Sequence, residues 1–310
     1  MRVVFMGTPD FAVPALKALV EAGHDVAAAV TQPDRPKGRG RKETPPPVKL
    51  AAKAFGIPVF QPAKIKDPDF IEILRGLSPE VIVVVAFGRI LPPDVLRLPA
   101  LGCINVHASL LPKYRGAAPI HWAVMNGEEE TGITIMYMDE GLDTGDIILQ
   151  QAMPIGKDEN AGSVHDRLAV SGARLLLEAL ELIEKGRAPR IPQSGNATYA
   201  PVLKSEDELI RWDRPAISIY NQIRGMNPWP GAHTLFGGKT LKIWDSALAG
   251  EAEAEFIPGL VVGGSGDGIV VATGSGLLKI TELQLQGAKR LKAADFLRGT
   301  EVPHGTVLGH

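Results

Sequence analysis

The chain has 310 residues with 33 basic and 35 acidic side chains, which gives a formal net charge of −2 at pH 7. Hydrophobic residues make up 45% and charged residues 22%, a mixture that excludes disordered and collagen-like chains. At roughly 150 residues per domain, the length predicts two domains. The balanced charge excludes a protein that coats nucleic acid over its whole surface, but it allows a local basic patch.

A single cysteine, Cys103, stands in the sequence. One thiol cannot form an internal disulfide, a four-thiolate zinc site or a Cys-x-x-Cys redox pair. The first residues lack the long apolar run of a signal peptide, and no stretch of about 18 uncharged apolar residues predicts a membrane span. We therefore expect a cytoplasmic protein that tolerates reducing conditions and does not bind a membrane.

Over residues 1–185, short apolar runs alternate with segments of helical periodicity, which is typical of a mostly parallel sheet covered by helices on both faces. The runs predict strands at 3–6, 26–31, 81–86, 103–108, 133–138 and 147–155. Helices are predicted at 11–22 and 164–185, the second capped by Ser163. These elements predict a Rossmann-like, doubly wound α/β domain over residues 1–188.

Residues 34–49 follow the second predicted strand and carry six basic and two acidic side chains, a local charge of +4. The glycines and prolines in this segment predict an irregular loop. Its basic side chains must then face solvent or a polyanion.

Residues 189–206 contain three prolines and a glycine without strand or helix periodicity, which predicts a linker. Beyond it, a helix predicted at 216–225 is followed by short strands separated by glycine-rich turns, at 233–236, 239–244, 260–262, 269–272 and 277–285. Many short strands with glycine turns predict a small, OB-like β-barrel over residues 207–310.

The densest polar group in an apolar setting is Asn105 and His107, in the strand predicted at 103–108. Alternate residues of a strand share a face, so the amide and the imidazole lie side by side while Val106 packs on the other face. Ligands of doubly wound sheets bind beyond the carboxyl ends of the strands, where this pair lies. The pair could stabilise an oxyanion, or it could only cap the loop that follows.

A second polar cluster, residues 138–146, carries four carboxylates. It could bind a metal, supply one acid–base group, or form a solvated turn, which the pattern alone favours. The spacing is not that of a calcium-binding EF-hand loop. The N-terminal segment 7–9 lacks the G-x-G-x-x-G fingerprint, which argues against a nicotinamide dehydrogenase.

Five segments of the chain resemble the methionyl-tRNA formyltransferase family: residues 5–12, 31–36, 105–120, 139–146 and 223–232. They span both predicted domains, so the resemblance covers essentially the whole chain. It implies transfer of a formyl group from 10-formyltetrahydrofolate to the α-amino group of methionyl initiator tRNA, for translation initiation. The Asn-x-His and Asp-Thr-Gly elements also resemble those of other enzymes that use this folate. The basic segment and the Asn-Pro-Trp-Pro-Gly sequence are what point to the methionyl-tRNA formyltransferase family in particular.

The same resemblance implies roles for individual residues. Asn105 and His107 would hold the oxyanion, and Asp143 would orient His107 and manage the proton that passes to the folate nitrogen. Folate would be a co-substrate, with no metal, and the residues implied to bind it are Ser109, Leu110, Leu111, Pro112, Phe87, Gly88, Ile90 and Leu91. The residues implied to bind tRNA are Arg39, Lys37, Arg41 and Lys42, in a protein that acts as a monomer.

Two other functions fit parts of the sequence. A 10-formyltetrahydrofolate-dependent formyltransferase or hydrolase that acts on a small amine would share the N-terminal chemistry, but it would need neither the basic segment nor a second domain. A catalytically silent RNA-binding module would have no use for Asn105, His107 and Asp143 together. The predicted second domain adds no net positive charge, because residues 205–310 carry 10 basic and 12 acidic side chains.

Overall fold

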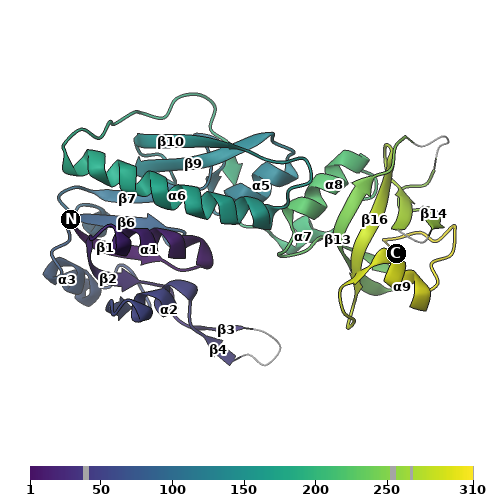
Figure 1. Cartoon of the computed structure of the whole chain (residues 1–310), viewed down its shortest axis with the longest axis horizontal. Coiled ribbons are helices and arrows are strands. Elements are labelled where there is room, and N and C mark those ends of the chain that lie inside the picture. Colours follow the sequence, from purple (N-terminus) through teal and green to yellow (C-terminus); the bar gives the residue numbers. More distant parts are fainter. Residues whose placement is uncertain (38–41, 252–255, 266–267, 310) are drawn as a thin grey trace. The chain divides into compact units, whose positions relative to one another are not determined.

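The computed structural model describes residues 1–37, 42–251, 256–265 and 268–309 (Figure 1). The chain divides into two compact units. The first unit comprises residues 1–119, 131–154 and 165–201, and the second comprises residues 120–130, 155–164 and 202–310. The second unit therefore includes two short segments, 120–130 and 155–164, that come before its main part in the sequence.

A seven-stranded sheet forms the centre of the first unit, in the order β10-β9-β7-β6-β1-β2-β5. Strands β5, β2, β1, β6 and β7 pair in parallel, and β9 is antiparallel to β7. This order confirms the predicted doubly wound sheet, with one antiparallel strand added. The strands are β1 (Arg2–Gly7), β2 (Asp25–Val30), β5 (Val59–Phe60), β6 (Val81–Val85), β7 (Cys103–His107), β9 (Glu130–Tyr137) and β10 (Ile147–Pro154).

The composition of strand β6 reflects a sheet that is covered on both faces. All five of its residues are apolar and buried, as a central strand requires. On one face, Val84 packs with Leu74 and Val95 in a buried cluster, whereas Figure 1 shows α6 running across the other face. The helices up to α6 are η1 (Asp10–Ala12), α1 (Val13–Glu21), α2 (Pro47–Ala54), α3 (Pro68–Gly76), α4 (Pro93–Leu96), α5 (Pro119–Met125) and α6 (Ala161–Glu184).

Helix α6 begins earlier than the sequence predicted. The backbone N–H of Ser163 donates to Oδ1 of Asn160 at 2.9 Å, so Asn160 caps the helix and the prediction of Ser163 as the cap is wrong. Asparagine is among the best N-cap residues, because its side-chain oxygen accepts a hydrogen bond from one of the free N–H groups of the first turn.

None of the helices in the described part of the chain combines the length and the apolar character that a membrane span needs.

The basic segment 34–49 is more ordered than predicted. Strands β3 (Arg35–Lys37) and β4 (Lys42–Thr44) form an antiparallel hairpin, and α2 starts at Pro47. The prediction of an irregular loop is therefore wrong for the described residues. Proline suits the first helical position, because the N–H that it lacks has no helical partner there.

Lys49 also differs from the prediction that the basic side chains of this segment face solvent or a polyanion. Its side chain is 16% exposed, and its Nζ donates to Oδ1 of Asp34 at 2.8 Å and to Oε1 of Gln61 at 2.7 Å. The hydrogen bond from Lys49, followed by that from Gln61, lowers the pKa of the Asp34 carboxyl. This cation therefore anchors the base of the hairpin.

The stretch that the sequence predicted as a linker pairs with the first unit over part of its length. Ile191 and Ile147 exchange backbone hydrogen bonds of 3.0 and 2.8 Å. Farther on, β11 (Tyr199–Ala200) pairs in parallel with β8 (Arg115–Gly116). The chain from Ile191 to Ala200 is thus fixed at both ends to segments of the first unit.

An antiparallel, curled sheet forms the centre of the second unit, in the order β12-β13-β16-β15-β14, with β17 paired to β16. This half-barrel and helix α8 agree with the sequence prediction. The turn between β12 and β13 consists of Gly237 and Gly238, both at positive φ, as a two-residue hairpin loop needs. The elements are α7 (Ser205–Glu208), α8 (Ala216–Gly225), β12 (His233–Phe236), β13 (Lys239–Leu248), β14 (Val261–Ser265), β15 (Gly268–Ala272), β16 (Leu277–Leu285), β17 (Leu291–Lys292) and α9 (Ala293–Gly299).

The core of the second unit lies between α8 and the curled sheet. Ile219 and Ile223 of α8 are buried together with Ile243 of β13 and Ile280 of β16. Helix α5 joins this unit, because Nδ1 of His121 lies 2.8 Å from the backbone oxygen of Gly225. A sheet and a helix that bury one apolar face each give this unit a core of its own.

Candidate active site

Strand β7 places two polar side chains at its C-terminal end. Asn105 is 9% exposed and His107 is 6% exposed. Their shared face is the one that buries Cys103 against α4, while Val106 lies close to Gly172 of α6 on the other face. The alternation predicted from the sequence is therefore confirmed for this strand.

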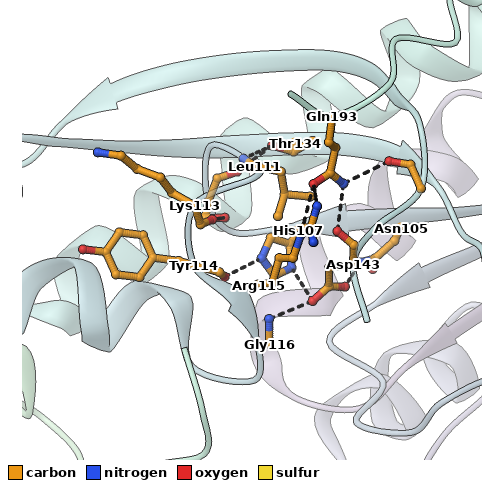
Figure 2. A network of polar contacts seen from close by, with 12 residues as sticks. Asn105, His107, Leu111, Lys113, Tyr114, Arg115, Gly116, Thr134, Asp143 and Gln193 are labelled. Carbon is orange, nitrogen blue, oxygen red and sulfur yellow. Dashed lines mark hydrogen bonds and ion pairs between the residues drawn. The ribbon is translucent and has the colours of Figure 1, made fainter. Parts of the chain in front are cut away.

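Asp143, in the loop between β9 and β10, reaches both side chains (Figure 2). Its Oδ1 accepts from Nδ2 of Asn105 at 3.4 Å, and its Oδ2 lies 3.7 Å from Nδ1 of His107. The backbone N–H of Gly116 donates to Oδ2 at 2.8 Å. The structure thus brings the three predicted catalytic side chains together, from segments 38 residues apart in sequence.

The second ring nitrogen of His107 is also engaged. Nε2 lies 3.0 Å from the backbone oxygen of Tyr114. This contact is a hydrogen bond in which the ring donates, because a carbonyl oxygen only accepts. Nδ1 is then the nitrogen that faces the carboxylate of Asp143, at 3.7 Å, and the hydrogen bond to Tyr114 sets the orientation of the ring.

The other carboxylates of residues 138–146 lie elsewhere. Oδ1 of Asp139 accepts from the N–H of Gly141 at 3.0 Å and from Oγ1 of Thr144 at 2.7 Å, in a local turn. Asp146 lies 3.7 Å from Arg190. Among residues that the structure describes, no group of three or more His, Cys, Asp or Glu side chains is placed to hold a metal ion.

Residues 109–112, which the resemblance assigns to folate, form a braced loop after β7. Thr134 of β9 holds it, since its Oγ1 donates to the oxygen of Ser109 at 2.6 Å and accepts from the N–H of Leu111 at 3.1 Å. Nε2 of Gln150 donates to Thr134 and to the oxygen of Leu111, both at 2.9 Å. Leu111 and Ser109 are buried, whereas Leu110 and Pro112 are half-buried.

The second set of residues assigned to folate is divided between core and surface. Phe87 and Leu91 are buried in the cluster below β6, while Ile90 is 77% exposed. Gly88 lies at φ +76°, a conformation that favours glycine. A folate-binding role for these four residues stays a prediction.

The residues assigned to tRNA lie in and around the β3–β4 hairpin. Lys37 ends β3 and Lys42 begins β4, and the two residues lie opposite one another in the backbone register of the hairpin. Arg39 and Arg41 lie outside the described residues. A tRNA-binding role for these four residues also stays a prediction.

The sequence analysis missed Gln193 and Arg115, whose side chains meet beside the loop of Asp143 (Figure 2). Gln193 comes from the stretch predicted to be a linker. Proline-rich sequence without periodicity gives no sign that one of its side chains contacts a distant loop. Arg115, in β8, follows the Asn-x-His strand closely, but a lone arginine carries no specific signal in the sequence either.

Cys103 is a core residue of β7. Its side chain is 2% exposed, and Sγ lies 3.7 Å from the backbone oxygen of Val95. Burial raises the pKa of its thiol to about 12. A thiol that resists ionisation is a poor nucleophile, because the thiolate is the reactive form.

Comparison with known proteins identifies both units. Residues 1–180 match the family model described as formyl transferase, and residues 202–301 match the model of the formyl transferase C-terminal domain. The chain is 70% identical over 309 residues to a protein of Pelotomaculum thermopropionicum named methionyl-tRNA formyltransferase, covering 100% of this chain and 99% of that one. It is 58% identical to a protein of the same name from Moorella thermoacetica, covering 100% and 99% of the two chains.

Among solved structures, the chain resembles HypX from Aquifex aeolicus in complex with tetrahydrofolic acid. The TM-score is 0.67 at 19% identity, and the match covers 99% of this chain and 50% of HypX. At this identity the likeness concerns the fold. The two family models and the full-length relatives together show that the chain belongs to the methionyl-tRNA formyltransferase family.

Proposed function

We propose that this protein transfers the formyl group of 10-formyltetrahydrofolate to the α-amino group of methionyl initiator tRNA and so produces formylmethionyl-tRNA. The observation that carries the proposal is the convergence of Asn105, His107 and Asp143 at the carboxyl edge of the sheet. The full-length relatives named methionyl-tRNA formyltransferase support the choice of substrate.

The chemistry follows from what these three groups can do. The neutral amine attacks the formyl carbon, a new C–N bond forms, and the carbonyl oxygen becomes negative. Asn105 stabilises that oxygen by donating a hydrogen bond from a largely buried site, where such bonds are strongest. His107 is the second donor once its Nε2–H exchanges the oxygen of Tyr114 for the formyl oxygen. The bond from carbon to the folate nitrogen then breaks, and Asp143 helps to move the proton from the amine to that nitrogen, directly or through water.

The loop of residues 109–112 is suited to hold a flat heteroaromatic donor beside this site. Its backbone is fixed by Thr134 and Gln150, and it follows directly after His107. A ligand of this kind needs an apolar wall with a few backbone hydrogen-bonding groups that keep their positions. The tetrahydrofolic acid bound by HypX, which shares the fold, supports the same donor class.

Two regions carry the chemistry that tRNA requires. The β3–β4 hairpin of the first unit lies within the basic segment of residues 34–49. In the second unit, the guanidinium of Arg290 and Nζ of Lys242 lie 5.0 and 5.5 Å from the ring centre of Trp244. Cations near aromatic rings suit RNA, since they pair with phosphates while the ring stacks on an unstacked base. Arg290 also forms an ion pair with Glu282 at 2.5 Å, so the cluster offers RNA an aromatic ring and two cations, one of them paired with a carboxylate.

The proposal is tested by one set of incubations. Purified protein receives 10-formyltetrahydrofolate with methionyl initiator tRNA, methionyl elongator tRNA, or small amines such as an amino-sugar nucleotide, and formyl transfer to each acceptor is followed. We expect rapid transfer to initiator tRNA and little to the others. Formylation of a small amine without transfer to tRNA, or hydrolysis of the folate alone, would refute the proposal.

A further inference from the structure

We propose that Gln193 is a positioning residue for the reaction: it fixes the loop that presents the Asp143 carboxylate to Asn105 and His107. The inference rests on the proposed role of Asp143. Figure 2 shows the Gln193 side chain between that loop and Arg115. Its place in the stretch after α6, far from the three catalytic side chains in sequence, is why sequence patterns do not reveal it.

The amide of Gln193 is fully engaged. Nε2 donates to the backbone oxygens of Asp143 at 2.8 Å and of Gly145 at 3.0 Å. Oε1 accepts from Nε and Nη2 of Arg115 at 3.1 and 2.6 Å. These partners fix the orientation of the amide, because a reversed amide would face two carbonyls with its oxygen and a guanidinium with its NH₂ group.

The loop needs such a support because its backbone is strained. Asp143 lies at φ +53°, in the left-handed region, which costs a residue with a side chain free energy and persists only where surrounding contacts enforce it. Gly145 lies so close to β9 that an added Cβ would stand 1.9 Å from the backbone oxygen of Tyr137. Gln193 binds the carbonyls of both residues and so holds the turn in the conformation that aims the carboxylate.

The same side chain joins the loop to the other wall of the site. Arg115 belongs to β8, next to Gly116, whose N–H donates to Oδ2 of Asp143. Strand β8 is in turn paired with β11, in the same stretch as Gln193. Gln193 therefore links the backbone of Asp143 to β8, the strand whose Gly116 binds the Asp143 carboxylate. The backbone and the carboxylate of Asp143 are thus held by connected parts of the site.

The test substitutes Gln193→Glu, which keeps the size of the side chain and the pairing with Arg115 but cannot donate to the two carbonyls. We expect kcat for formyl transfer to fall roughly tenfold to a hundredfold, since small displacements of a catalytic group cost rates of this order. The KM values for the folate and for tRNA are expected to stay within about threefold of the parent values, because binding groups are untouched. Gln193→Met repeats the test without a new charge, and the exposed neighbour Ser194→Ala is the matched control.

A double-mutant cycle separates positioning from a merely structural role. If Gln193 acts through Asp143, adding Gln193→Glu or Gln193→Met to Asp143→Ala lowers kcat by less than about threefold further, because coupled residues are not additive. Losses that multiply in the double variant would overturn the proposal, as would folded Gln193 variants with the parent kcat. If Asp143→Ala alone keeps the parent kcat, the proposed catalytic site has failed, and the Gln193 proposal fails with it.

Discussion

At the scale of single residues, the amide of Asn105 offers the most direct test of the site. Its Nδ2 is placed 3.4 Å from Asp143 on a strand that is buried throughout. We expect Asn105→Ala to fold normally and to lose roughly a hundredfold to a thousandfold in kcat, the usual cost of one oxyanion donor. Initial rates of formyl transfer at saturating folate and tRNA measure the loss, with circular dichroism as the control for folding.

An Asn105→Ala enzyme whose folded form retains near-normal kcat would contradict the role given to this amide. His107 could then still act alone on the formyl oxygen. The same assay on His107→Ala therefore shows whether the whole catalytic site is misassigned or only the role of Asn105 as a hydrogen-bond donor. Both substitutions remove side chains that are less than 10% exposed, so folding must be verified for each.

Cys103 supports a second prediction at this scale. Its thiol is buried and its pKa is raised to about 12 by that burial, so at pH 8 very little thiolate is present and access is blocked. We expect a thiol reagent to modify the native protein more than about a hundredfold more slowly than the urea-unfolded protein. The rate of colour release from a disulfide reagent measures this, and similar rates for the two forms would contradict the burial.

The catalytic residues differ in how far sequence could reveal them. Asn105 and His107 lie on a strand, so their relation to one another follows from a period of two residues. The position of Asp143 depends on the path of the β9–β10 loop, and its pattern by itself favoured a solvated turn. Only the resemblance to a family selected it from four nearby carboxylates.

At the scale of elements, β12 carries a titratable group that links folding to pH. His233 lies 3.9 Å from Glu208, yet burial lowers the pKa of His233, and Lys242 adds to that effect while Glu208 opposes it. The unfolded chain, with a histidine pKa near 6.5, therefore binds this proton more readily than the folded chain. The contribution of His233 to the free energy of unfolding is therefore constant above pH 6.5. It falls as the pH drops from 6.5 toward the lower pKa of the folded state.

His233→Gln is expected to flatten this dependence. Thermal unfolding is followed at pH values from 7.5 to about 5, and the melting temperature of the variant should decline less steeply than that of the parent. Some decline remains, because burial also lowers the pKa of His24 in the first unit. Equal slopes for variant and parent would show that His233 does not contribute.

Helices and strands with a regular spacing of apolar residues were predictable from the sequence. Elements that depend on a few individual contacts were not. Strand β6 follows from an uninterrupted apolar run and helix α8 from apolar residues at helical spacing, and both predictions lie close to the observed limits. The β3–β4 hairpin was missed because its strands are only three residues long and polar. Pairing with a partner strand and the anchor of Lys49 on Asp34 stabilise it, and neither contact leaves a periodic pattern.

At the scale of the whole molecule, recognition of tRNA should depend on salt far more than recognition of folate does. Each cation that neutralises a phosphate releases a counterion, so affinity falls with salt in proportion to the number of such contacts. We expect Arg39→Ala to raise the KM for methionyl initiator tRNA, to reduce the slope of log affinity against log salt by about one, and to leave the KM for folate unchanged.

The measurement is steady-state kinetics with each substrate varied at several salt concentrations. Lys17→Ala is a suitable control, because Lys17 is an exposed cation of α1 that pairs with Glu21 and lies outside the basic segment. If Arg39→Ala keeps the parent KM for tRNA at every salt concentration, the basic segment does not bind the acceptor.

The sequence by itself determined the strands and helices with strong periodicity, the two-part organisation, the doubly wound sheet and the pair Asn105 and His107. These features follow from local patterns, because burial of one face imposes its period on the residues of that element. Tertiary structure decided which carboxylate meets the pair, which lysine is internal, and that Gln193 supports the loop of Asp143. Those outcomes depend on contacts between residues distant in sequence, and such contacts arise only when the whole chain is folded.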